Sequence, residues 1–209
     1  MFRLFRFISS GAVLACGWLA LHPAPAVEGL PVATAAAVGA STSVPWGWVD
    51  FCQRYEGECA LGAAGEKEVT LSPHALADIK RVNRWVNAHV EPTTDMDHWG
   101  VEDRWDLPLD GKGDCEDFAL FKRKMLMQAG YPRAALLVTV VHDGAEAGHA
   151  ILTVKTDKGD LVLDNLNDEV KPWTTAGYQF VKRQSQEDPN VWVKIQSPAQ
   201  AKLASSAPM

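Results

Sequence analysis

Apolar residues recur at helical spacing after Ser72 and Pro73 in the first half of the chain. A serine followed by a proline is typical of an N-cap and a first helical residue. The pattern therefore predicts a helix that starts at Pro73 and continues for about three to five turns, with one face turned to a core. That face is formed by Leu76, Ile79, Val82, Trp85, Val86 and Val90.

A second helical pattern begins at Cys115 and includes Phe118, Leu126 and Ala129. Gly130 follows it, and a glycine directly after the last periodic residue commonly ends a helix. Cys115 is thus predicted in the first helical turn. There the backbone N–H groups and the helix dipole favour a thiolate.

Three runs of β-type residues follow this second helix, at residues 135–141, 149–155 and 161–166, and a further run lies at 191–195. Residues 157–160 combine Asp, Lys and Gly between two of the runs, which predicts a hairpin. Helices followed by antiparallel strands indicate an α+β fold. The aromatic segment 46–52 is read as a strand or a packed loop.

The strand pattern also places a histidine and an acid together. If Asp157 pairs with Asp160 across the hairpin, Asp164 stands opposite Thr153 on the face that also carries His149. Four residues separate the two along the strand, about 13 Å. A His149–Asp164 hydrogen bond therefore requires a shifted register, a bulge or a strongly bent strand. An acid buried in an apolar strand also requires a partner.

The first 26 residues have the pattern of a secretory signal peptide: two arginines, an apolar run and a small-residue cleavage site at 24–26. Lipidation at Cys16 and a membrane anchor are the alternatives. Residues 27–45 are mostly small, with Glu28 as the single charged residue, and are expected to be a flexible linker. This divides the chain into a signal peptide (1–26), the linker, one domain over 46–195, and a disordered tail (196–209).

Export affects how the cysteines and the charge are interpreted. Cys52 and Cys59 could close a short loop in an oxidising compartment, or could stay reduced, and pairing them leaves Cys115 as a free thiol. The net charge of −6 becomes −8 without the two arginines of residues 1–26. This acidic balance argues against nucleic acid as a partner, for which a basic patch would be expected.

Three residues can be assembled into a nucleophilic constellation. A Cys115 thiolate would attack a carbonyl, His149 would transfer the proton, and Asp164 would fix the imidazole tautomer. On these residues alone, a structural cysteine, a capping histidine and a turn aspartate are equally consistent with the sequence.

The segments Gly113–Ala119, Gly148–Ala150 and Leu163–Asn165 together resemble the bacterial transglutaminase-like cysteine proteinases of the LapG type. The resemblance spans about residues 46–195. It implies a papain-like or transglutaminase-like fold in which helices, including the cysteine helix, pack on an antiparallel sheet. It also implies a Cys-His-Asp triad of Cys115, His149 and Asp164, and an enzyme that is a cysteine endopeptidase.

The same resemblance implies a Ca²⁺ cofactor held by Asp114, Glu116 and Asp117. Carboxylates are suitable calcium ligands, and the cation would offset their effect on the thiol. It further implies a periplasmic protease that cuts a surface adhesin near its N-terminus, controlled by an inner-membrane cyclic-di-GMP receptor. No stable membrane insertion is expected after the signal is cleaved.

Two other functions use the same sequence features. A transglutaminase or peptide amidase would need the same triad, and a binding module would need no catalysis. The oxyanion donor is open: the Cys115 backbone N–H and the indole N–H of Trp99 or Trp105 are the candidates.

Overall fold

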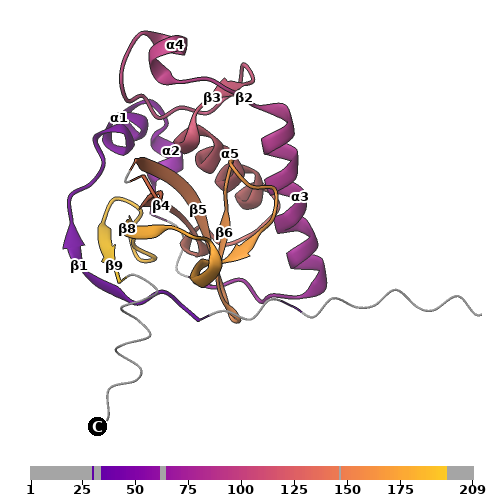
Figure 1. The fold of residues 1–209 in the computed structure, drawn as a ribbon. Coiled ribbons are helices and arrows are strands. Elements are labelled where there is room, and N and C mark those ends of the chain that lie inside the picture. Colours follow the sequence, from indigo (N-terminus) through magenta and orange to yellow (C-terminus); the bar gives the residue numbers. More distant parts are fainter. Residues whose placement is uncertain (1–29, 31–33, 62–64, 146, 197–209) are drawn as a thin grey trace, which may run out of the picture.

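The computed structural model describes residues 30, 34–61, 65–145 and 147–196. They form one mixed helix and antiparallel sheet structure, so the α+β prediction is confirmed (Figure 1). The helices are α1 (Trp46–Arg54), α2 (Glu56–Cys59), α3 (Pro73–His89), α4 (Asp95–Trp99) and α5 (Cys115–Gln128), with 3-10 turns at Arg133–Ala135 and Trp173–Thr175. The strands are β1 (Val38–Thr42), β2 (Glu91–Pro92), β3 (Lys112–Gly113), β4 (Leu136–His142), β5 (Gly148–Thr156), β6 (Gly159–Leu163), β7 (Lys171–Pro172), β8 (Gln179–Gln184) and β9 (Trp192–Ile195).

Seven strands form the main sheet in the order β1-β9-β8-β4-β5-β6-β7, with antiparallel pairing throughout. Helix α5 packs against β4 and β5, and α3 packs beside α5 on the same side (Figure 1). The core between them contains Ile79, Val86, Leu126, Leu152 and Leu163, each fully buried. The long axis of α5 is thereby fixed over the centre of the sheet.

The helix predicted after Ser72 is confirmed. Ser72 accepts a hydrogen bond from the backbone N–H of Ala75 at 3.1 Å, and Pro73 is the first helical residue. The strands expected at 135–141, 149–155 and 191–195 are also present, as β4, β5 and β9. The strand expected at 161–166 is present as β6, but it ends at Leu163, so that Asp164 follows the strand instead of lying inside it.

The segment around Trp46 is a helix, which corrects the expectation of a strand or loop. In α1 the indole of Trp48 and the ring of Phe51 are buried while Trp46 is 73% exposed. The aromatic alternation that suggested a strand therefore reflects helical spacing, with residues 48 and 51 on one face.

The expected flexible linker over 27–45 is wrong for its second half. Residues Val38–Thr42 form the edge strand β1, which pairs with β9, and the N–H of Gln196 donates to the carbonyl of Ala37 at 3.1 Å. Small residues suit an edge strand whose side chains are mostly exposed. The predicted signal peptide and nearly all of the predicted tail lie outside the described residues. None of the described helices has both the length and the apolarity that crossing a membrane requires.

The hairpin between β5 and β6 is confirmed, with a register that differs from the one expected. Thr156 pairs with Gly159 and Lys155 with Asp160, so the turn is formed by residues 157 and 158. Relative to the expected pairing, Asp164 moves two residues closer to His149 along β5. The parity of the two side chains is unchanged, because the shift is an even number of residues.

Cys52 and Cys59 form a disulfide that ties α1 to α2. Cys115 is the one free cysteine of the described part of the chain. The open question of whether these two residues pair is thereby answered in favour of the bridge.

Candidate active site

The nucleophile candidate lies at the first residue of α5, as the sequence predicts. The chain turns into the helix at Gly111, which has a φ of 86°, and Asp114 occupies the N-cap without a side-chain capping bond. Gly113 passes so close to the helix that a Cβ there would lie 2.6 Å from Oδ2 of Asp117. Because Gly113 has no side chain, the carboxylate of Asp117 can lie against the backbone just before Cys115. The acids and the thiol can therefore lie close together at the start of α5.

The surroundings of the Cys115 sulfur are acidic. Burial raises the pKa of the thiol, and Glu116, whose Oε2 lies 3.0 Å from Sγ, raises it further. The backbone N–H of Ala150 acts in the other direction and lowers the pKa, but the balance lies above the ordinary value. In this arrangement the sulfur is a thiol that donates to Glu116, and the helix dipole alone does not make it a thiolate.

Five carboxylates converge on this turn from α4, from the loop after it and from α5. Oxygens of Asp95, Asp114 and Asp117 lie within 4.8 Å of one another, and so do oxygens of Asp95, Asp103 and Glu116. Oδ1 of Asp114 and Oδ2 of Asp117 are buried and accept no hydrogen bond within the described part of the chain. Both are therefore free to coordinate a cation.

Crowding perturbs the ionisation of these acids. Burial raises the pKa of Asp117 to about 9, and the neighbouring acids Glu116, Asp114 and Asp95 raise it further. Burial and the charge of Asp114 raise the pKa of Glu116 to about 8. The pKa values of Asp95 and Asp114 are also raised, chiefly by burial. Such a group of acids is costly to keep charged without a cation.

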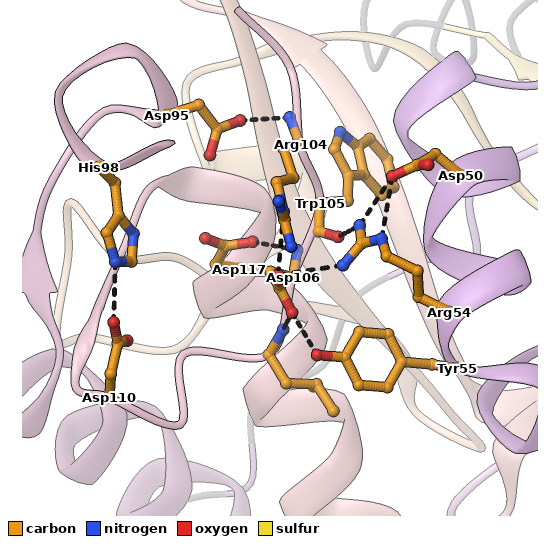
Figure 2. A network of polar contacts seen from close by, with 11 residues as sticks. Asp50, Arg54, Tyr55, Asp95, His98, Arg104, Trp105, Asp106, Asp110 and Asp117 are labelled. Atoms are coloured by element: carbon orange, nitrogen blue, oxygen red, sulfur yellow. Dashed lines mark hydrogen bonds and ion pairs between the residues drawn. The ribbon is translucent and has the colours of Figure 1, made fainter. Parts of the chain in front are cut away.

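The long connection before Cys115 is held against the rest of the fold by a polar network (Figure 2). The backbone N–H of Asp106 donates to Oδ1 of Asp117 at 2.6 Å, and Arg54 reaches from α1 to Oδ2 of Asp106 at 3.0 Å. The backbone N–H of Arg104 donates to Asp95. This network brings Asp95 and Asp103 to the cysteine turn. The sequence pattern did not single out these two acids.

His149 lies on β5 and Asp164 directly follows the last residue of the adjacent strand β6, and the two side chains are hydrogen bonded. Nε2 of His149 lies 2.9 Å from Oδ1 of Asp164, which also accepts from the backbone N–H of Leu166 at 3.0 Å. The other oxygen, Oδ2, accepts from the hydroxyl of Tyr178. Burial raises the pKa of Asp164, but these three donors outweigh it and hold the pKa below its ordinary value. A neutral imidazole in this contact carries its proton on Nε2, which leaves Nδ1 as the basic atom.

The cysteine lies beside the start of β5. Its sulfur is close enough to the backbone N–H of Ala150, the residue after His149, for that group to lower its pKa, and its charge acts on Tyr178. The hydrogen-bond partner of the sulfur is Glu116. The structure therefore brings the three candidates to one end of the sheet and joins two of them directly.

The indole N–H of Trp105 is already engaged in the observed arrangement, and Trp99 is exposed. Trp105 donates to Oδ1 of Asp103 at 2.9 Å, and its ring packs against Trp48 and Trp192 in the core. Trp99 stacks on His98 at 3.9 Å between ring centroids and is 41% exposed. The Cys115 backbone N–H remains the oxyanion donor that the sequence offers.

Comparison with known proteins was made by family, by sequence and by structure. The family model described as bacterial transglutaminase-like cysteine proteinase (BTLCP) matches residues 38–200. Calcium-bound LapG of Legionella pneumophila is similar in structure, with a TM-score of 0.50 and 23% identity over 65% of this chain and 82% of that chain. The EGTA-treated form matches at 25% identity and a TM-score of 0.45, over 55% of this chain and 64% of that chain. No curated protein sequence matches the chain.

Proposed function

Because the chain belongs to the family of bacterial transglutaminase-like cysteine proteinases, we propose that it is an endopeptidase whose triad is Cys115, His149 and Asp164. The observation that carries this proposal is the 2.9 Å hydrogen bond from His149 to Asp164 at the end of the sheet where the free cysteine starts α5. A nucleophile, a base and a group that orients the base are thereby available together.

The reaction follows from the roles of the atoms. The Cys115 sulfur attacks the scissile carbonyl carbon, and its proton passes to Nδ1 of His149. The imidazolium then protonates the leaving amine as the C–N bond breaks, which leaves a thioester on Cys115. A water molecule gives a proton to Nδ1 and attacks the thioester, and the thiol is restored. Asp164 keeps Nε2 protonated throughout, so that Nδ1 is the atom that exchanges protons.

We further propose a calcium ion bound by Asp114, Glu116 and Asp117, with Asp95 and Asp103 as additional ligands. The residues present fit such an ion, because they supply clustered hard oxygen ligands and two of those oxygens are buried without a partner. LapG, the similar solved protein, has a calcium-bound form. Bound calcium would offset the carboxylate charge that opposes formation of the thiolate.

The compartment, substrate and partner form the rest of the proposal. We place the enzyme in the periplasm, exported by residues 1–26, where it cleaves the N-terminal region of a large surface adhesin. An inner-membrane cyclic-di-GMP receptor would control access to that substrate and so biofilm dispersal. The Cys52–Cys59 bridge supports an oxidising compartment. The substrate and the receptor rest on the family resemblance.

The test is cleavage of a purified adhesin N-terminal segment in calcium buffer. The wild-type protein should cut it, and Cys115→Ala should show no cleavage above background. An exposed neighbour, Asp97→Asn in α4, serves as the control and should retain activity. Full cleavage by Cys115→Ala would overturn the proposed nucleophile. Incorporation of an added amine in place of hydrolysis would identify a transglutaminase.

A further inference from the structure

Tyr178 contacts both the acid and the imidazole of the proposed triad. It lies just before β8, and its hydroxyl donates to Oδ2 of Asp164. Its ring lies 5.5 Å from the imidazole of His149, with 43° between the two planes. A tyrosine in this position can act on the triad in two ways, through its hydroxyl and through its ring.

The backbone of Asp164 is already fixed by other groups. Its carbonyl accepts a hydrogen bond from Nδ2 of Asn87 on α3 at 2.9 Å. The remaining freedom lies in rotation of the carboxylate about its last side-chain bond, which is a soft torsion. His149 and the N–H of Leu166 both bind Oδ1. Tyr178 is the donor that the structure gives to Oδ2, so it completes the constraint on this rotation.

We propose that Tyr178 is a positioning residue of this protease, whose hydroxyl holds the Asp164 carboxylate while its ring covers the His149–Asp164 bond. The inference rests on the proposed function, because it assigns Tyr178 a role in the same triad. The hydroxyl keeps Oδ1 directed at Nε2, and the ring limits access of water to that bond. Together they give the imidazole one orientation, which a proton-transfer group requires.

Charge around Asp164 supports this assignment. Lys122 is buried on α5, and its ammonium has no hydrogen-bond partner among the described residues. Burial lowers the pKa of Lys122 to about 7, and Asp164 and Asp168 act against that shift. Lys122 therefore interacts with Asp164 through its charge and not through a hydrogen bond. The groups that donate hydrogen bonds to the Asp164 carboxylate are His149, Leu166 and Tyr178.

The test compares two tyrosine-to-phenylalanine variants. Tyr178→Phe removes the hydroxyl beside the triad. Tyr131→Phe removes one that donates to Asp78 at 3.0 Å, beyond the other end of α5, and is the matched control. In adhesin cleavage, Tyr178→Phe should lower kcat about tenfold with KM within about twofold, the size expected for one lost hydrogen bond to a charged group. Tyr131→Phe should leave both constants unchanged. Equal kcat in Tyr178→Phe and wild type would overturn the proposal.

A spectroscopic measurement tests the same point without requiring cleavage. The Nε2–H proton of His149 should give an exchange-protected downfield resonance in the NMR spectrum of the full protein, identified by its loss in His149→Ala. Tyr178→Phe should shift or broaden it, whereas Tyr131→Phe should not. If the wild-type protein cuts no substrate, the proposed function fails and this resonance still decides the role of Tyr178. An unchanged resonance in Tyr178→Phe would contradict the role.

Discussion

The two halves of the site differ in how completely their polar atoms are paired. On the strand side, His149 and both oxygens of Asp164 have partners within the fold. On the helix side, Asp114 and Asp117 each bury an oxygen without a partner in the described part of the chain, and Cys115 donates to Glu116. The strand half is organised by the protein alone, and the helix half has the composition of a cation site.

The pKa values of the two halves shift in opposite directions. Hydrogen bonds outweigh burial at Asp164 and hold its pKa below the ordinary value. Burial dominates at Asp117 and raises its pKa to about 9. In the proposed triad, the His149–Asp164 pair is therefore formed by protein groups alone, while the ionisation of Cys115 depends on how the charge of its acidic neighbours is offset. Control by calcium would act on the nucleophile and leave the His149–Asp164 pair intact.

Removal of calcium should have the largest effect on cleavage, and it should affect the helix half of the site but not the strand half. EGTA is expected to abolish adhesin cleavage, because the unbalanced acids keep the Cys115 sulfur protonated, and added Ca²⁺ should restore it. The His149 Nε2–H resonance should persist in EGTA, since its partners are all protein groups. Loss of that resonance on chelation would show that the two halves are coupled. Cleavage that continues in EGTA would contradict the calcium proposal.

Asp164→Ala should reduce kcat about 10⁴-fold, the usual cost of losing the acid of a triad. Asp164→Asn should lose much less, because its amide oxygen can accept from His149 while its nitrogen donates to the Tyr178 oxygen. Calcium should raise the thermal midpoint of both variants, as we expect it to do for the wild-type protein. Glu169→Ala, an exposed acid of the same loop, is the control. A midpoint that no longer responds to calcium in Asp164→Ala would contradict independent halves.

Gly113→Ala should weaken calcium binding by the helix half and leave the His149–Asp164 pair of the strand half unchanged. The added Cβ would meet Oδ2 of Asp117 at 2.6 Å and its Cβ at 2.7 Å, while the Gly113 carbonyl is held by the N–H of Thr93. Calcium affinity should fall about 10- to 100-fold, as for other changes that displace a ligand. Gly144→Ala, where an added Cβ has open space, should bind calcium normally. Calorimetric titration measures both, and equal affinities would show that Asp117 is not a ligand.

The metal-free protein should become less stable as pH rises from about 5 to about 9. Asp117 and Glu116 have raised pKa values in the folded state, about 9 and about 8, so the fold holds more protons than the unfolded chain in this range. Each group contributes up to about 1.4 kcal/mol per pH unit to the slope.

Urea unfolding in EGTA measures this slope, and Asp117→Asn should flatten it. Asp164 has the opposite sign, because its lowered pKa stabilises the fold above about pH 4 and this contribution is lost on further acidification. A metal-free stability that stays level from pH 5 to 9 would contradict the raised pKa values.

Several features were within reach of the sequence because they depend on local pattern. The apolar spacing and the Ser72 cap predicted α3, and the turn residues at 157–160 predicted the hairpin. The sequence also suggested Cys115 at the start of α5 and the shared parity of His149 and Asp164. The sequence pattern did not point to Asp95 and Asp103, since their position depends on the network through Arg104 and Asp106.

The sequence by itself determined α3, the start of α5 and the strands β4, β5 and β9, because helical and strand periodicity lie along the chain. Only the tertiary structure decided the two-residue hairpin turn that brings Asp164 to His149, the place of β1 at the sheet edge, and the contact of Tyr178 with Asp164. These depend on pairing between distant segments. The register of paired strands and the contacts between distant side chains depend on which segments pack together. No local sequence pattern specifies this.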